Sequence, residues 1–205
     1  MVETLKVVGI GGSLSDNSTS LAALNVALTG AEQAGAETRL FDVRELDLPM
    51  YTPDLRDVPQ RAHLYAEAVC EAHALIWSSP LYHGTVSGSF KNALDWLQLL
   101  GDKDPPFLTD RVIGLIATAG GTQGLQAVNT MEFIVRALRG WAVPLVLPIS
   151  KAWQAFNEDG TPRDTAVAAQ LSALGTEVVR AARQFDTDGF CDYSVPSVGI
   201  DRTSG

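Results

Sequence analysis

Cysteine, positive charge and long apolar runs are all scarce in this sequence, and each shortage excludes a class of protein. The two cysteines, Cys70 and Cys191, form no C-x-x-C pair and no Cys/His cluster, so neither a disulfide scaffold nor a zinc site is indicated. Lys and Arg number 15 against 24 Asp and Glu. The resulting net charge of −9 argues against nucleic acids and anionic membrane surfaces as partners.

No apolar run approaches the roughly 20 residues that a membrane-spanning helix needs. Residues 1–6 also lack the basic and apolar regions of a signal peptide, so we expect a cytoplasmic protein. The 205 residues are 46% hydrophobic, which suits one compact domain. We place that domain at 1–186 and expect residues 187–205, rich in Asp, Ser and Gly, to be a flexible C-terminal tail.

Strand and helix patterns alternate along the whole domain. Apolar segments predict strands at 5–10, 37–43, 74–79, 111–118 and 143–147. Helical periodicity lies between and after them, at 18–34, 60–72, 89–99, 125–138 and 163–185. Five strands alternating with five helices predict an α/β fold, a doubly wound five-stranded parallel sheet with right-handed crossovers.

Single residues refine this prediction. Pro144 cannot donate a hydrogen bond within a sheet, so we expect the last strand to lie at an edge. In the helix at 60–72 we expect Leu64 to face the core. We expect His63 and His73 to lie at the surface or at a helix end.

The first strand leads into a segment rich in glycine and hydroxyl groups, G-G-S-L-S-D-N-S-T-S at 11–20. A helix begins there, and a helix N-terminus presents unpaired N–H groups and the positive end of the helix dipole. Together these features predict a phosphate-binding loop. The simpler alternative is a Gly-Ser turn followed by a Ser/Thr N-cap, with no ligand.

Missing motifs narrow the kind of phosphate. The segment has no G-x-x-x-x-G-K-[ST], and Leu14 stands where the third glycine of G-x-G-x-x-G would be. Nucleoside triphosphates and dinucleotide pyrophosphates are therefore poor fits. The loop better suits the terminal phosphate of a mononucleotide such as FMN.

Two further loops are rich in glycine, P-L-Y-H-G-T-V-S-G at 80–88 and A-G-G-T-Q-G at 119–124. They follow the third and fourth predicted strands. With the strand order 2-1-3-4-5, the first, third and fourth strands are neighbours, and their carboxyl ends share one edge of the sheet. We therefore expect all three loops to meet in one crevice.

These segments carry a resemblance to a known family. The stretches G-S-L-S-D-N-S-T-S at 12–20 and S-P-L-Y-H-G-T-V-S-G-S-F-K-N-A-L-D-W-L at 79–97 resemble the NAD(P)H-dependent FMN reductases, whose fold is flavodoxin-like. The segment L-P-M-Y-T-P-D-L at 48–55 is similar to that family too. The resemblance covers about residues 5–150. It implies an enzyme that passes hydride from NAD(P)H through FMN to a small acceptor such as free flavin, a quinone, an azo dye or a metal oxyanion.

The resemblance also implies which residues bind FMN. The phosphate-binding hydroxyls of the family match Ser13, Ser18, Thr19 and Ser20, with Ser15 where many members have arginine. The loop beside the isoalloxazine ring matches Pro80, Leu81, Tyr82, His83 and Gly84, and the loop on its other edge matches Ala119, Gly120 and Gly121. Because the cofactors carry the hydride chemistry, no catalytic side chain and no metal is expected.

Two site residues keep alternative interpretations. Tyr82 either stacks near the flavin ring or packs against the helix at 89–99. His83, where the family often has asparagine, either contacts flavin or substrate or only shapes its loop.

The helix at 89–99 also bears on assembly. Its apolar stripe of Phe90, Leu94, Trp96 and Leu97 is broader than one core face needs. This breadth predicts a homodimer or homotetramer through the helix, as is common in the family. Lys91 and Asp95 are either an exposed i,i+4 pair or ions of that interface.

Two other functions compete with the reductase. A flavodoxin-type electron carrier would bind FMN without turning over a nicotinamide nucleotide. A non-redox protein could bind a phosphate or nucleotide in the same loop. No basic cluster for a 2′-phosphate is visible, so the sequence leaves the choice between NADH and NADPH open.

Overall fold

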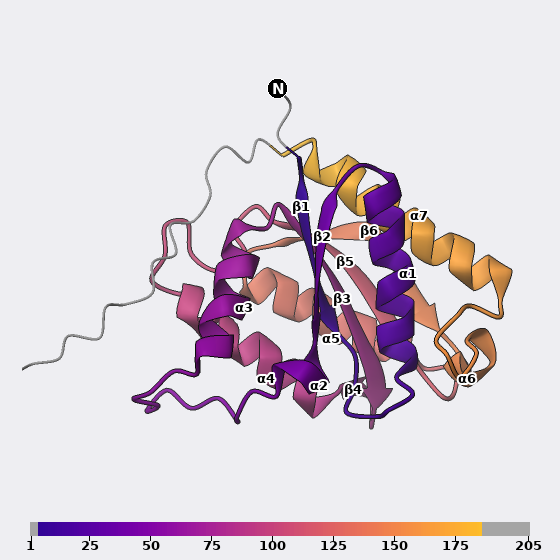
Figure 1. Ribbon diagram of the computed structural model, residues 1–205, viewed down its shortest axis with the longest axis horizontal. Helices are drawn as coiled ribbons and strands as arrows, with labels where there is room; N and C mark the ends of the chain where they lie inside the picture. The colour runs from indigo at the N-terminus through magenta and orange to yellow at the C-terminus, as the bar shows by residue number, and fades with distance from the viewer. Residues whose placement is uncertain (1–3, 186–205) are drawn as a thin grey trace, which may run out of the picture.

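The computed structural model describes residues 4–185, which contain a parallel sheet with helices on both faces (Figure 1). The predicted tail lies outside the described residues. The five parallel strands are β1 (Lys6–Gly11), β2 (Glu37–Asp42), β3 (Ala74–Tyr82), β5 (Val112–Thr118) and β6 (Trp141–Ile149). Their order is β2-β1-β3-β5-β6. The short β4 (Thr85–Val86) lies off this path, so the five main strands have the predicted order 2-1-3-4-5.

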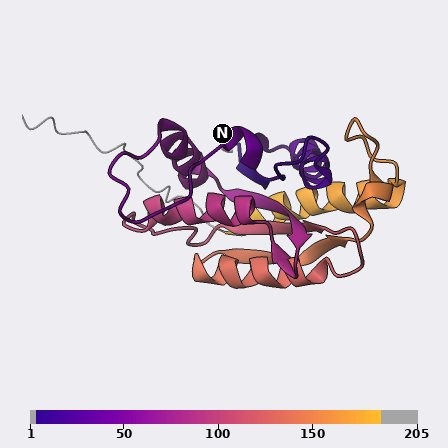
Figure 2. The same ribbon diagram turned by 90° about the horizontal axis from the view of Figure 1, so that it is seen from below.

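Helices cover the two faces of the sheet. One face packs against α1 (Thr19–Gln33) and α7 (Thr165–Ala182). The other packs against α3 (Gln60–Glu71), α4 (Gly88–Asp95), the 3₁₀ helix η1 (Trp96–Leu100) and α5 (Leu125–Ala137). Figure 2 shows α1 and α5 on opposite sides of the sheet. The sequence did not predict two short helices, α2 (Val43–Leu46) and α6 (Ala152–Ala155).

The third strand is longer than predicted because it continues into a hairpin. Leu81 and Tyr82 pair with β4, so Pro80 to Tyr82 lie in a strand and not in a loop. The turn between the strands consists of His83 and Gly84, with φ of +50° and +87°. Positive φ at both central residues is the geometry of a tight two-residue hairpin turn.

The last strand confirms the prediction from Pro144. Among the described residues, β6 pairs with β5 and lies at the end of the strand order. The pairing shifts register between Ile113 and Leu115, opposite the segment that contains Pro144. A bulge at an edge strand accommodates a residue that cannot donate.

The structure contradicts the predicted burial of Leu64 and the predicted spare face of the stripe at 89–99, whereas His73 lies at a helix end as predicted. Leu64 is 42% exposed, and the neighbouring Tyr65 is buried in its place. His73 directly follows the C-cap of α3; it is buried there, and its Nδ1 accepts a hydrogen bond of 3.0 Å from the backbone N–H of Lys6. The apolar stripe of α4 and η1 leaves no spare face, because all four of its residues are buried within this chain: Phe90, Leu94, Trp96 and Leu97.

Helices α1 and α7 touch through their backbones. A Cβ added at Gly175 in α7 would overlap the carbonyl oxygen of Ala27 and lie 2.6 Å from the backbone nitrogen of Ala31, both in α1. A Cβ at Gly30 would overlap the backbone at Ser172 in the same way. The position of α1 against the sheet therefore depends on two glycines.

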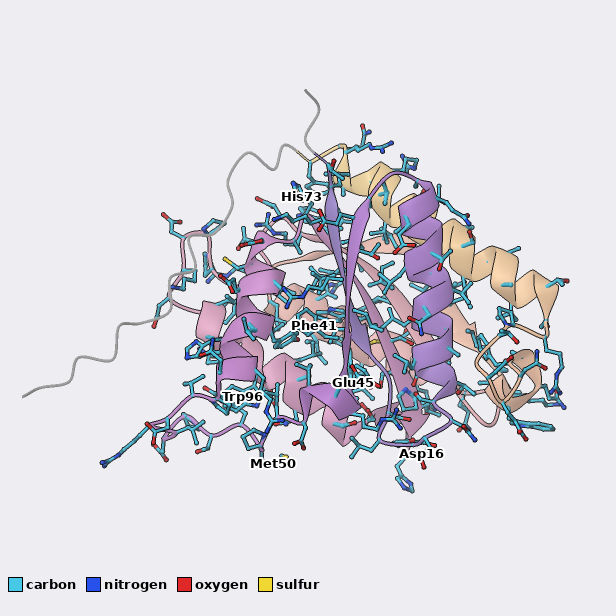
Figure 3. The ribbon with its side chains drawn as sticks, in the orientation of Figure 1. Asp16, Phe41, Glu45, Met50, His73 and Trp96 are labelled. Carbon is cyan, nitrogen blue, oxygen red and sulfur yellow. The ribbon has the colours of Figure 1, made fainter. Side chains whose placement is uncertain are left out.

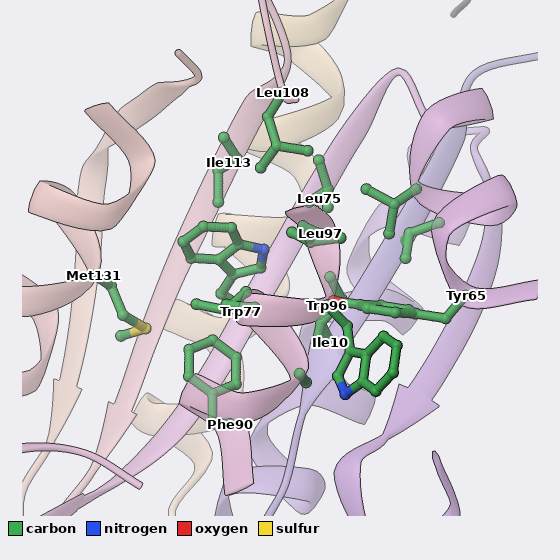
Figure 4. Packing of buried hydrophobic residues seen from close by; sticks show 14 of the residues in the cluster. Ile10, Tyr65, Leu75, Trp77, Phe90, Trp96, Leu97, Leu108, Ile113 and Met131 are labelled. Carbon is green, nitrogen blue, oxygen red and sulfur yellow. The ribbon is translucent and has the colours of Figure 1, made fainter. Parts of the chain in front are cut away.

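Tyr65 of α3 points into the core (Figure 4). Its ring meets Phe41 edge to face, with centroids 5.2 Å apart. Burial raises the pKa of its hydroxyl far above the ordinary value, and the hydroxyl has no hydrogen-bond partner among the described residues.

We therefore expect Tyr65→Phe to stabilise the protein. Removing an unpaired buried hydroxyl while keeping the ring relieves a desolvation cost of about 1–2 kcal/mol. Urea denaturation followed by tryptophan fluorescence measures the free energy of unfolding. A loss of stability would show that the hydroxyl has a partner in solution.

Candidate active site

The three predicted loops leave the sheet at one edge. In the register of the sheet, Gly11 of β1 lies beside Ser78 of β3, and Pro80 of β3 lies beside Thr118 of β5. The carboxyl ends of these three neighbouring strands thus point the same way. A Cβ at Gly84 in the hairpin turn would lie 3.4 Å from Oε1 of Gln126, so the hairpin tip adjoins the start of α5.

Ser78 ties both ends of the loop between β1 and α1. Its carbonyl oxygen accepts a hydrogen bond of 3.2 Å from the N–H of Gly12, and its hydroxyl donates one of 2.8 Å to the carbonyl of Ser20. A side chain at Gly11 would overlap the Ser78 carbonyl, and Gly12 has a φ of +98°. Both glycines are therefore required by the path of the loop.

Some hydroxyl groups of this loop form hydrogen bonds within it, and others have exposed surface. Ser18 is the N-cap of α1: its Oγ accepts from the N–H of Leu21 at 3.2 Å and lies 3.1 Å from Oγ of the buried Ser20. Ser13 is also buried, and its Oγ accepts from the N–H of Ser15. Ser15 is exposed and Thr19 is half-buried. Ser18 thus caps α1, and the N-terminus of α1 points at the loop.

The other predicted contacts lie around the hairpin tip and after β5. Pro80 is buried in the sheet, Leu81 is half-buried, and Tyr82 is 49% exposed at the end of β3. His83 and Gly84 are exposed in the turn. On the β5 side, Ala119 is buried, whereas Gly120 and Gly121 are exposed.

Gly120 and Gly121 leave room for a ligand beside the end of β5. Neither has a positive φ, and a Cβ at either would meet no atom of the described residues within 4 Å, chain neighbours apart. The fold itself therefore gives no reason for glycine at these positions. A flat ring resting on the backbone would give one, because a side chain would occupy its place. The residues present fit FMN: a helix N-terminus and hydroxyl-rich loop for the phosphate, and an open glycine pair for the ring.

The segment at 48–51 is fastened to this edge by residues whose role the sequence did not reveal. The side-chain amide of Asn92 donates to the carbonyl oxygens of Leu48 and Pro49, and its oxygen accepts from the N–H of Tyr51 at 2.9 Å. Trp96, one helical turn later, donates from Nε1 to the same Pro49 carbonyl. The i,i+4 spacing in K-N-A-L-D-W was the available signal.

This fastening holds an exposed methionine at the edge. Met50 is 78% exposed, and Figure 3 shows it on the same side of the molecule as Asp16 of the first loop. The segment also explains the breadth of the apolar stripe, because Tyr51 packs edge to face on Trp96 at 5.5 Å.

A groove of about 650 Å³ runs from the first loop between α1 and the segment 153–163. Ser18 and Thr19 line its start, and Trp153 and Arg163 lie among its other walls. Neither the hairpin tip nor Gly120 lines it, so the groove reaches the first loop and not the other two.

Within residues 4–185 no group of three or more His, Cys, Asp or Glu side chains is placed to hold a metal ion. No helix in that range is long and apolar enough to cross a membrane.

The sheet order and the loop at α1 define a flavodoxin-like α/β protein. Comparison with known proteins gives the family: residues 5–154 match the model of the NADPH-dependent FMN reductases. An FMN-dependent NADPH-azoreductase of Staphylococcus aureus is 32% identical over 162 residues, which are 77% of this chain and 83% of that protein. The chain belongs to the NADPH-dependent FMN reductase family.

Solved structures support the fold. The flavoenzyme NAD(P)H:(acceptor) oxidoreductase FerB of Paracoccus denitrificans has a TM-score of 0.70 at 20% identity, covering 88% of this chain and 98% of that one. A WrbA-like flavodoxin of Agrobacterium tumefaciens has a TM-score of 0.60 at 18% identity, covering 89% and 99%.

Membership of the family confirms three predictions. The protein is an enzyme, an oxidoreductase that transfers hydride from a nicotinamide nucleotide through FMN. It uses FMN and a nicotinamide nucleotide as cofactors, as expected. The alternatives of a pure electron carrier and of a non-redox binding protein are not supported.

Proposed function

We propose that FMN lies across the three loops and that its electrons pass to a small conjugated acceptor, such as free flavin, a quinone or an azo compound. The phosphate end lies in the loop at 12–20, and the ring lies between the β3–β4 hairpin tip and Gly120–Gly121. The observation that carries this placement is the pair of exposed glycines for which the fold itself has no need.

Each element then has a defined task. FMN supplies the hydride chemistry when bound. The N-terminus of α1 and the hydroxyls of Ser15 and Thr19 bind the phosphate. Backbone N–H groups of Gly84, Gly120 and Gly121 face the polar edge of the ring, where they stabilise negative charge. Tyr82, half exposed at the end of β3, is the aromatic side chain placed to contact the ring.

Steady-state assays test the proposal. Purified protein is mixed with FMN and with NADPH or NADH, and the absorbance of the reduced nicotinamide is followed with free FMN, a quinone, an azo dye or chromate as acceptor. We expect oxidation with at least one acceptor. No oxidation with any of them, while FMN still binds, would leave an electron carrier. Unchanged FMN fluorescence on titration would contradict the flavin site itself.

We propose a homodimer or homotetramer in which the surface between α4 and α5 is covered. The buried stripe of α4 gives no support, and Lys91 and Asp95 form an i,i+4 ion pair on one helix. A largely apolar groove of about 530 Å³ remains beside them. Phe133, which is 72% exposed, lies along it. Light scattering measures the mass in solution, and a monomer would contradict the assembly.

We further propose that residues 1–186 act as one domain in the cytoplasm and that, besides further copies of the chain, the partner is a small-molecule electron acceptor and neither nucleic acid nor a membrane. The net charge of −9 supports the exclusion of nucleic acids and of anionic membranes.

A further inference from the structure

The loop at 11–20 contains no Lys, Arg or His, yet it is proposed to bind a phosphate dianion. Ser15 is neutral, and the next residue, Asp16, is acidic. A helix N-terminus supplies only a partial positive charge. A carboxylate beside the phosphate would oppose binding unless a cation from another element compensates it.

Arg44 is such a cation. It lies in α2, directly after β2, and its Nη1 is 3.0 Å from Oδ1 of Asp16. This ion pair brings the guanidinium to the rim of the first loop although the two residues are 28 positions apart.

The backbone of Arg44 is fixed beside the loop. Its N–H donates to Oδ1 of Asp42 at 3.0 Å, and its Nε lies 3.9 Å from Oδ2 of the same carboxylate. Asp42 is buried against the loop: its Oδ1 lies 2.8 Å from the position that a Cβ at Gly12 would take. The side chain of Arg44 therefore extends from a backbone position that Asp42 fixes beside the first loop.

The ion pair between Arg44 and Asp16 is weak enough for another anion to replace Asp16. The Asp16 side chain is 99% exposed and that of Arg44 is 41% exposed, and ion pairs this open to water contribute little. A phosphate dianion carries more charge than one carboxylate and can accept two parallel hydrogen bonds from a guanidinium. Phosphate is thus the stronger partner for Arg44.

We propose that Arg44 binds the phosphate of FMN, exchanging Asp16 for it, and so supplies from α2 the positive charge that the first loop lacks. Arg44 is then a selectivity residue, which favours the phosphorylated flavin over riboflavin. The inference rests on the proposed placement of FMN.

Fluorescence titration with FMN and with riboflavin tests it, because riboflavin has the same ring and no phosphate. We expect Arg44→Ala to raise the Kd for FMN about tenfold or more, the effect of losing a charge-assisted hydrogen bond, and to leave the Kd for riboflavin unchanged. Arg61→Ala is the matched control. Arg61 also forms an exposed ion pair of 3.0 Å, with Asp47 outside the first loop, and its loss changes the net charge equally.

Asp16→Asn gives a second test that does not depend on the folding of the first variant, since Asp16 is almost fully exposed. It frees Arg44 and removes a repulsive charge, so the Kd for FMN should fall several-fold and that for riboflavin should not. Equal changes for both flavins, or no change in either variant, would overturn the role of Arg44. Failure of the unmodified protein to bind either flavin would instead contradict the proposed function.

Discussion

Gly175→Ala is expected to lower the free energy of unfolding by about 2 kcal/mol. The added methyl group meets the backbone of α1 at Ala27 and Ala31, and a backbone cannot rotate away as a side chain can. Overpacking of this kind costs about 1–3 kcal/mol or more. The higher helix propensity of alanine returns at most about 1 kcal/mol.

Urea denaturation measures this loss, with Gly88→Ala as the matched control. Gly88 is also helical, but a Cβ there meets nothing within 4 Å among the described residues, chain neighbours apart. We expect Gly88→Ala to be neutral or slightly stabilising. Equal effects in the two variants would show that α1 and α7 can separate without cost.

The second large effect concerns binding and not stability. Gly120→Val is expected to raise the Kd for FMN by about tenfold or more, while the free energy of unfolding changes by less than about 0.5 kcal/mol. In the protein alone the new side chain enters open space. With FMN in its proposed place, the same side chain would displace the ring.

Fluorescence titration and urea denaturation of the same preparations separate the two quantities. Gly88→Val is the control for adding valine at an equally open glycine, since Gly88 starts α4, lines the α4–α5 groove and is not among the residues proposed to contact the ring. Unchanged FMN affinity in Gly120→Val would place the ring elsewhere. A large loss of stability would mean that the glycine serves the fold after all.

The features predicted correctly depend on local sequence. Strands buried on both faces carry continuous apolar runs, as at 74–77 and 112–116, and can be recognised without knowing their neighbours. The start of α1 is specified by its own cap, Ser18. Once alternation gave a doubly wound sheet, the shared edge of the three loops followed from the strand order.

The errors arose where packing decides between equivalent local choices. In α3, Leu64 and Tyr65 are adjacent apolar residues, and the rotation of the helix on the sheet selects Tyr65 for the core. The stripe of α4 and η1 is broad because a segment 40 or more residues earlier covers part of it, through Asn92 and Trp96. The β3–β4 hairpin depends on a positive φ at His83, a residue less usual there than asparagine or glycine.

The site was predicted only as far as its loops. The pairing of Arg44 with Asp16 joins α2 to the first loop, and no spacing in the sequence indicates it. The same holds for the bridging role of Ser78, which depends on the register of β1 beside β3.

That bridge has a consequence for how quickly cofactor is taken up. Ser78 forms hydrogen bonds to both ends of the segment from Gly12 to Ser20. These bonds restrain the backbone of the segment in the folded protein before any ligand binds. Capture of a phosphoester then requires little further loss of chain entropy. Uptake should therefore be limited by diffusion and by the exchange of surface ions, with no slow rearrangement of the backbone.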